Sequence, residues 1–224
     1  MGKYFGTDGI RGVANSELTC ELAMNIARAA SSFFNDGNAP LFIGRDTRLS
    51  GTMLEAAFNA GAQSAGKDVL SAGIIPTPAV SFLTKNLSCS FGVVISASHN
   101  PVGDNGIKLF SSDGYKLSDS SELQIENMIK FDWSGLPTVG KLQLFDSAAD
   151  LYAEHVKKSV NFDLSGLKIA IDCANGAAFY AAPKILRELG ADVIAINAEP
   201  VPPHARFQSS SISINQTSSS NCAA

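Results

Sequence analysis

The sequence has little that would support a metal-thiolate, redox, membrane or nucleic-acid role. Its four cysteines are far apart and form no CxxC pair, so we expect free thiols and neither a zinc site nor a redox motif. No apolar run is long enough to cross a bilayer, and the first residues lack the apolar region of a secretion signal. The net charge is -4 without a basic stripe. We therefore expect a cytoplasmic protein whose partners include neither a nucleic acid nor a membrane.

What is present is an ordinary globular composition, with 45% apolar and 17% charged residues. Strand-like and helix-like segments alternate, which predicts an α/β fold with a mixed, mostly parallel sheet sandwiched by helices. We expect one complete domain over residues 1–147 and an incomplete second α/β domain over 148–200. Residues 201–224 hold many serines and little periodicity, so we expect a disordered tail there.

Capping patterns predict where two helices begin. Thr52 and Glu55 have the Thr-x-x-Glu spacing of a capping box, and Asp119 and Glu122 repeat it, so helices are expected to start at Thr52 and Asp119. The Asp113-Gly114 pair predicts a tight hairpin turn between a strand over 107–110 and another over 115–117.

The segment Ser96-Ala97-Ser98-His99-Asn100-Pro101 follows a predicted buried strand over 91–95. Loops that leave the C-terminal ends of strands carry function in open α/β sheets, and Ser98 would be exposed there. A serine hydroxyl needs a base or a stabilising field to act as a nucleophile, and Lys108 could move its proton if burial or Arg11 lowered the lysine pKa. The alternatives are a plain polar turn and a solvated strand-end lysine.

Two further segments favour anion binding. In Phe5–Gly12 the glycines and Thr7 let the backbone approach an anion, and Arg11 can bind phosphate through two donors. Gly44–Gly51 places arginines ahead of a helix N-terminus, among them Arg45. Read alone, these segments could be a glycine-rich hairpin and a surface Arg45–Asp46 pair. Together, the three segments predict phosphate chemistry.

The segments FGTDGIRG, IGRDTRLSG and ISASHNPVGDNGIKLF, with the Pro76-Thr77-Pro78 loop, resemble the N-terminal motifs of the α-D-phosphohexomutase family. The resemblance extends from about Lys3 to Glu199 and is closest to the branch that acts on glucosamine phosphates. It implies an isomerase whose phosphoserine, here Ser98, donates its phosphoryl group to a hexosamine phosphate. The bisphosphate then returns its other phosphoryl group, which interconverts glucosamine 6-phosphate and glucosamine 1-phosphate.

The same resemblance implies the roles of individual residues. Catalytic roles fall to Ser98, Lys108, Arg11 and His99. Substrate contacts fall to Thr7, Arg45 and Asn100. It also implies Mg²⁺, held by the phosphate on Ser98 and by an Asp-Gly-Asp-Gly-Asp-Arg loop that this sequence does not contain. Because those aspartate ligands are absent, we expect the chain to be a truncated and poorly active form.

Three alternatives stay open at this point. The chain could belong with phosphoglucomutases or phosphomannomutases, which would share the serine loop. It could instead be a non-catalytic phosphosugar-binding fragment. A strand edge over 193–196 left open by the unfinished second sheet would permit pairing with another copy, so a homodimer is also possible.

Overall fold

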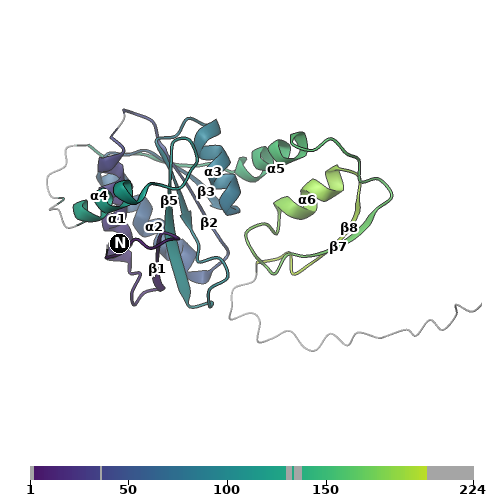
Figure 1. The fold of residues 1–224 in the computed structure, drawn as a ribbon, viewed down its shortest axis with the longest axis horizontal. Coiled ribbons are helices and arrows are strands. Elements are labelled where there is room, and N and C mark those ends of the chain that lie inside the picture. Colours follow the sequence, from purple (N-terminus) through teal and green to yellow (C-terminus); the bar gives the residue numbers. More distant parts are fainter. Residues whose placement is uncertain (1–2, 36, 130–132, 134–137, 201–224) are drawn as a thin grey trace, which may run out of the picture.

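The computed structural model describes residues 3–35, 37–129, 133 and 138–200, and their elements fall into a larger and a smaller unit (Figure 1). The disordered tail predicted for 201–224 lies outside the described residues. The elements of the larger unit are β1 (Ile10–Val13), α1 (Cys20–Phe33), β2 (Leu41–Arg45), α2 (Leu49–Ser64), β3 (Val69–Ile74), α3 (Thr77–Asn86), β4 (Phe91–Ile95), β5 (Asp104–Ser111), α4 (Asp119–Met128) and β6 (Leu142–Leu144). The elements that follow β6 along the chain are α5 (Ala148–Lys158), β7 (Lys168–Asp172), α6 (Ala181–Glu188) and β8 (Asp192–Ile196).

The larger unit is built on a six-stranded sheet with the order β1-β5-β4-β2-β3-β6. Strand β2 pairs in parallel with β3 and β4, and β3 pairs in parallel with β6, whereas β5 runs antiparallel to both β1 and β4. The sheet is therefore mixed and mostly parallel. This confirms the fold class predicted from the alternating sequence pattern.

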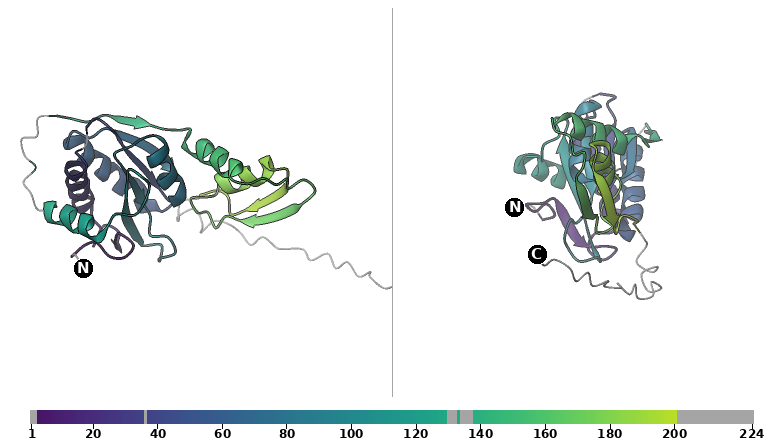
Figure 2. Two further views of the ribbon diagram at one scale, coloured as in Figure 1. Left: turned by 45° about the horizontal axis from the view of Figure 1, so that its top comes forward. Right: turned by 90° about the vertical axis from the view of Figure 1, so that its right-hand side faces the viewer.

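Helices cover both faces of the sheet (Figure 2), and strand residues alternate between two cores on these faces. Leu41 and Ile43 of β2 belong to a core that α1 and α2 cover, while Phe42 belongs to a second core with residues of α3 and α5. Each of these three strand side chains is fully buried. Burying apolar area on both faces stabilises such a sheet by about 25 cal/mol per Å². This two-sided burial explains why the strands read as short continuous apolar runs.

Both predicted capping boxes are wrong. Helix α2 begins at Leu49, three residues before Thr52, and Arg48 at its N-cap makes no side-chain capping bond. The Glu55 carboxylate instead accepts hydrogen bonds from Arg45 and Ser71. Helix α4 does begin at Asp119, but the Ser118 hydroxyl caps it and Glu122 pairs with Lys116. Both glutamates thus bind residues outside their own helix and do not cap its N-terminus.

The predicted hairpin is only partly formed. The tight turn is present, because the Gly114 N–H donates to Ser111 and the Ser111 N–H donates to Tyr115. Beyond it, residues 115–117 form no strand and make one isolated bridge, between Lys116 and Phe110. A side chain that would have continued the strand, that of Leu117, is buried in the core beside α4.

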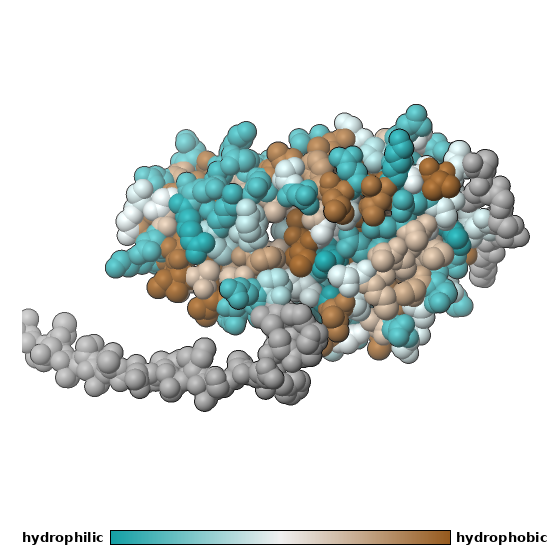
Figure 3. All heavy atoms as spheres, turned by 180° about the vertical axis from the view of Figure 1, so that it is seen from behind, coloured by the Kyte–Doolittle hydropathy of each residue, from teal (hydrophilic) through white to brown (hydrophobic). Residues whose placement is uncertain are grey.

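The smaller unit contains the parallel pair β7–β8 with α6 packed on one face. On the other face the strands expose apolar side chains, including Ile194 at 66% and Ile196 at 51%. In the view from behind, hydrophobic residues are interspersed with hydrophilic ones on the surface of the molecule (Figure 3). Helix α5 contacts both α3 and α6, so it joins the two units. A domain boundary at residue 147 stays a prediction.

Candidate functional site

The loops that carry the predicted site lie together at one edge of the sheet. Strands β2, β3 and β4 are parallel, and Arg45 at the end of β2 is level with Ile74 and Ile95 of its neighbours. The loops that follow these three strands therefore emerge side by side. With residues 174–178 of the smaller unit they line a cleft of about 840 Å³ that includes Ser98.

Ser98 is exposed at the tip of a tightly held turn. Its backbone has φ of 53°, in the left-handed region that non-glycine residues seldom adopt. The Ser98 N–H donates to the Ser96 hydroxyl at 3.1 Å, and that hydroxyl donates to Asp46 at 2.6 Å. The Asn100 N–H donates to the Ala97 carbonyl at 3.0 Å and closes the turn. The predicted exposure of Ser98 agrees with this geometry.

Close packing of β5 on the base of this loop explains the glycine at 106. The Ser96 N–H donates to the Gly106 carbonyl at 2.9 Å. A Cβ atom at Gly106 would lie 2.7 Å from the Ser96 carbonyl oxygen and 3.0 Å from that of Ile10. Any larger residue would push β1 or the serine loop away, so glycine at this position keeps the loop seated on the sheet.

Arg11 reaches the serine loop from β1. Its Nη1 donates to the Asn100 side-chain oxygen at 2.8 Å, and its Nη2 pairs with Asp8 at 3.1 Å. The buried Nε of Arg11 has no partner among the described residues. A guanidinium has five N–H donors, and within the described residues two of those of Arg11 are bound, one on Nη1 and one on Nη2. The structure thus brings together Arg11, Asn100 and Ser98 as the sequence predicted.

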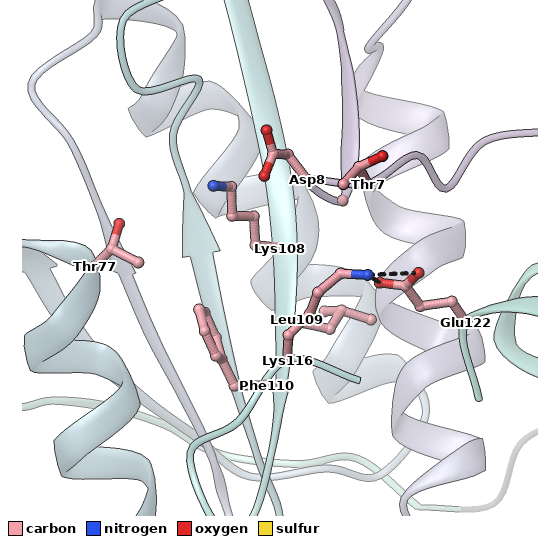
Figure 4. A pocket seen from close by; sticks show the side chains of 9 residues that line it. Thr7, Asp8, Thr77, Lys108, Leu109, Phe110, Lys116 and Glu122 are labelled. Carbon is pink, nitrogen blue, oxygen red and sulfur yellow. Dashed lines mark hydrogen bonds and ion pairs between the residues drawn. The ribbon is translucent and has the colours of Figure 1, made fainter. Parts of the chain in front are cut away.

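Lys108 lies on β5 in a neighbouring cavity of about 220 Å³ that Thr7, Asp8 and Thr77 also line. Its ammonium group points between Asp8 and Thr77, whereas Lys116 pairs with Glu122 at the far side (Figure 4). The Lys108 backbone pairs with Val94 of β4, and within the described residues its side chain makes no hydrogen bond or ion pair. Thr77 lines both this cavity and the Ser98 cleft, so the two spaces adjoin at the start of α3.

The remaining predicted residues are placed differently. Arg45 points away from the cleft: its Nε donates to Glu55 at 2.8 Å, and its Nη1 donates to the Asp46 carbonyl. The His99 side chain is exposed and contacts no polar group of the described residues. The structure therefore leaves Arg45 and His99 outside the cluster that Ser98, Asn100 and Arg11 form.

The sequence pointed to the Gly44–Gly51 segment but singled out Arg45 within it, and so it missed Asp46 and Arg48 as members of the site. Arg48 Nε pairs with Asp46 at 3.1 Å, and the Arg48 guanidinium also contacts the serine loop. A signal for Arg48 was present: Arg45 is the last residue of β2, so Arg48 is the arginine of this segment that lies in the loop after the strand. No sequence signal distinguishes Asp46, whose partners lie in different loops.

Mg²⁺ does not fit the protein side chains alone. No group of three or more His, Cys, Asp or Glu side chains in the described ranges could hold a metal ion. The carboxylate that lines the Ser98 cleft, that of Asp46, is already engaged by Arg48 and Ser96. Separately, none of the helices in the described part of the chain is long and apolar enough to span a membrane.

Comparisons with known proteins agree with this geometry. Residues 2–132 match the family model described as phosphoglucomutase/phosphomannomutase, alpha/beta/alpha domain I. Phosphoglucosamine mutases of Pelotomaculum thermopropionicum and Rhizobium etli are each 52% identical to this chain over 207 residues, which are 89% and 88% of it and 46% of each relative. The chain thus spans about half the length of these relatives.

Solved structures give the same result at lower identity. A putative phosphomannomutase of Thermus thermophilus matches with a TM-score of 0.77 and 27% identity, over 88% of this chain and 46% of that one. A phosphoglucomutase/phosphomannomutase family protein of Burkholderia thailandensis matches with a TM-score of 0.74 and 28% identity, over 87% and 44%. The family model covers more than half of the chain, and the chain therefore belongs to the phosphoglucomutase/phosphomannomutase family of phosphohexomutases.

Proposed function

We propose that this chain carries the phosphoserine of an isomerase that interconverts glucosamine 6-phosphate and glucosamine 1-phosphate. The proposal rests on the position of Ser98, which is exposed in a cleft at the tip of a fixed turn. Arg11 binds the side chain of Asn100, two residues further along the same turn. Phosphoryl transfer asks mainly for positioning and for neutralisation of charge, and this arrangement supplies both.

In the proposed reaction a sugar hydroxyl attacks the phosphorus of phosphorylated Ser98. The new sugar O–P bond forms as the Ser98 O–P bond breaks, the sugar hydroxyl loses its proton, and Ser98 regains one. The bisphosphate then turns and returns its other phosphoryl group to Ser98 by the reverse steps. In this proposal Arg11, which contacts Asn100, holds the serine phosphate and Lys108 moves the proton, with Thr7 and Asn100 as contacts of the substrate.

The relatives support a glucosamine phosphate as the substrate. The two phosphoglucosamine mutases are 52% identical to this chain, whereas the proteins described as phosphomannomutase or phosphoglucomutase are 27% and 28% identical. Mg²⁺ belongs to the proposal as well. A phosphate on Ser98 would be one ligand, and the aspartate ligands that the resemblance implies are absent from this sequence. A bound Mg²⁺ would supply charge neutralisation for the transferred phosphate.

Intact-mass measurement tests the phosphoserine. The chain is incubated with glucosamine 1,6-bisphosphate and Mg²⁺, and we expect the mass of one phosphoryl group, mapped to Ser98 by peptide sequencing. Ser98→Ala is the matched control and should gain no mass. A phosphate that maps to another residue, or a wild-type chain that never gains one, would contradict the proposal.

A coupled assay tests turnover by the 224-residue chain. Because the sequence contains no Asp-Gly-Asp-Gly-Asp-Arg loop, we expect the chain to be far slower than a full-length relative even when Ser98 is phosphorylated. Mutase activity comparable with that relative would show that this expectation is wrong. Offering glucose 1,6-bisphosphate and mannose 1,6-bisphosphate in parallel would distinguish the alternative phosphohexomutases by the sugar that phosphorylates Ser98 fastest.

A further inference from the structure

Every N–H of the Arg48 guanidinium donates a hydrogen bond to a protein group. Its Nη2 donates to the carbonyls of Ser98 and Asn100, both at 2.9 Å. Its Nη1 donates to the carbonyls of Pro101 at 2.6 Å and Asp104 at 3.0 Å. Its Nε donates to Asp46 at 3.1 Å. Since a guanidinium has five N–H donors, none remains for a phosphate ligand.

Asp46 ties this guanidinium to the same turn from the other side. Its carboxylate accepts from Arg48 Nε, from the Arg48 backbone N–H at 3.0 Å, and from the Ser96 hydroxyl. The Ser96 hydroxyl in turn accepts the Ser98 N–H. Only 10% of the Arg48 side chain and 15% of the Asp46 side chain are exposed. Hydrogen bonds to charged groups in such a shielded place are stronger than those between neutral groups.

These contacts bear on the backbone of Ser98, which holds φ of 53° without being glycine. A residue in this strained region persists when the surroundings determine its conformation, and such residues cluster at functional sites. Here the Ser98 N–H is bound through Ser96 and the Ser98 carbonyl is bound by Arg48. With both backbone groups held inward, the Ser98 side chain is left at the cleft.

We propose that Arg48 is a positioning residue, which fixes Ser98 in its left-handed conformation by binding the backbone carbonyls of residues 98–104. This inference rests on the proposed function, because its consequence for reactivity requires that Ser98 accept the phosphoryl group. Arg48 itself contacts no phosphate. In the proposed function it is Arg11, beside Asn100, that binds the phosphate directly.

Single-turnover phosphorylation of Ser98 separates these two roles. The rate is measured against the concentration of glucosamine 1,6-bisphosphate for the wild type, Arg48→Met, Arg48→Lys and Arg11→Met. We expect Arg48→Met to lower the maximal rate about 100-fold, because small misplacements of reacting groups cost that much. The half-saturating donor concentration should stay within about 2-fold, since no ligand contact is lost. Arg11→Met should instead raise that concentration.

Backbone hydrogen exchange gives a second readout that does not depend on phosphorylation. The Ser98 and Asn100 amides should exchange at least about 10-fold faster in Arg48→Met, because the turn opens locally. Arg48→Lys keeps the charge but cannot reach four carbonyls, so it should fall between wild type and Arg48→Met. Arg28→Met is the matched control, since Arg28 lies on α1 and bonds Ser64, and it should change neither readout.

Each outcome decides the matter. A raised half-saturating concentration with an unchanged maximal rate in Arg48→Met would show that Arg48 binds the donor, and the inference would be wrong. Unchanged amide exchange in both Arg48 variants would equally overturn it. If the wild type is never phosphorylated but exchange rises in the Arg48 variants, the positioning role stands and the proposed function falls. Should Arg48→Met not fold, Arg48→Lys and Ser96→Ala, which interrupts the Asp46 link, carry the same test.

Discussion

Replacing Arg45 with methionine should destabilise the fold without affecting the binding of a phosphoryl donor. The Arg45 Nε lies 2.8 Å from a Glu55 oxygen, and the two side chains are 16% and 11% exposed. The other Glu55 oxygen accepts from the Ser71 hydroxyl at 2.6 Å. Arg45→Met therefore leaves a shielded carboxylate with one neutral partner.

The size of the effect follows from this geometry. Removing one partner of a buried ion pair costs about 3–5 kcal/mol, and the residual exposure of both side chains lowers our expectation to about 2–3 kcal/mol. For a chain of this length that corresponds to a fall in Tm of roughly 5–10 °C. Arg187→Met is the matched control, because Arg187 is exposed, and it should cost less than about 0.5 kcal/mol.

A double-mutant cycle with Glu55→Met isolates the pair. Unfolding in urea, followed by circular dichroism, should show that Arg45→Met/Glu55→Met is about 1–3 kcal/mol more stable than the sum of the single changes predicts. Additive effects would refute the argument that the two charges depend on each other. A stable Arg45→Met that needs more bisphosphate to phosphorylate Ser98 would also refute it, and would restore Arg45 as the substrate ligand that the sequence predicts.

Three other features give shorter tests. Burial raises the pKa of the Cys89 thiol to about 11, so iodoacetamide should modify Cys89 far more slowly than Cys20 in the folded chain, and equally fast in denaturant. Burial also raises the pKa of Glu122 above 4.5, so the protonated carboxyl stabilises the fold at low pH and this stabilisation is lost as pH rises from 4.5 through the higher value. The free energy of unfolding of Glu122→Gln should therefore depend less on pH in this range. Phe82 stacks on His155 at 3.7 Å between ring centroids, so His155→Ala should cost about 0.5–1.5 kcal/mol in thermal unfolding.

The buried central strands were predictable because each is a short apolar run, whereas no strand was predicted at the two edges, β1 and β6. The apolar run over 91–95 predicted a buried strand, and β4 occupies those residues. The local capping rules failed where a glutamate had a stronger partner far away in the chain. Glu55 binds Ser71, sixteen residues further on and in the next strand, so no window around the start of α2 contains the information that sets its role.

The arginines show the same limit within the site. In the sequence, Arg11, Arg45 and Arg48 are alike, since each stands near glycines in or beside a loop and can bind phosphate. In the structure they differ in the partners that their guanidinium groups bind. Arg45 donates to Glu55 and to the Asp46 carbonyl, four carbonyls and Asp46 take all five donors of Arg48, and Arg11 donates to Asn100 of the serine loop. Because most of those partners lie about 50 or more residues away, only the folded chain shows which groups each arginine binds.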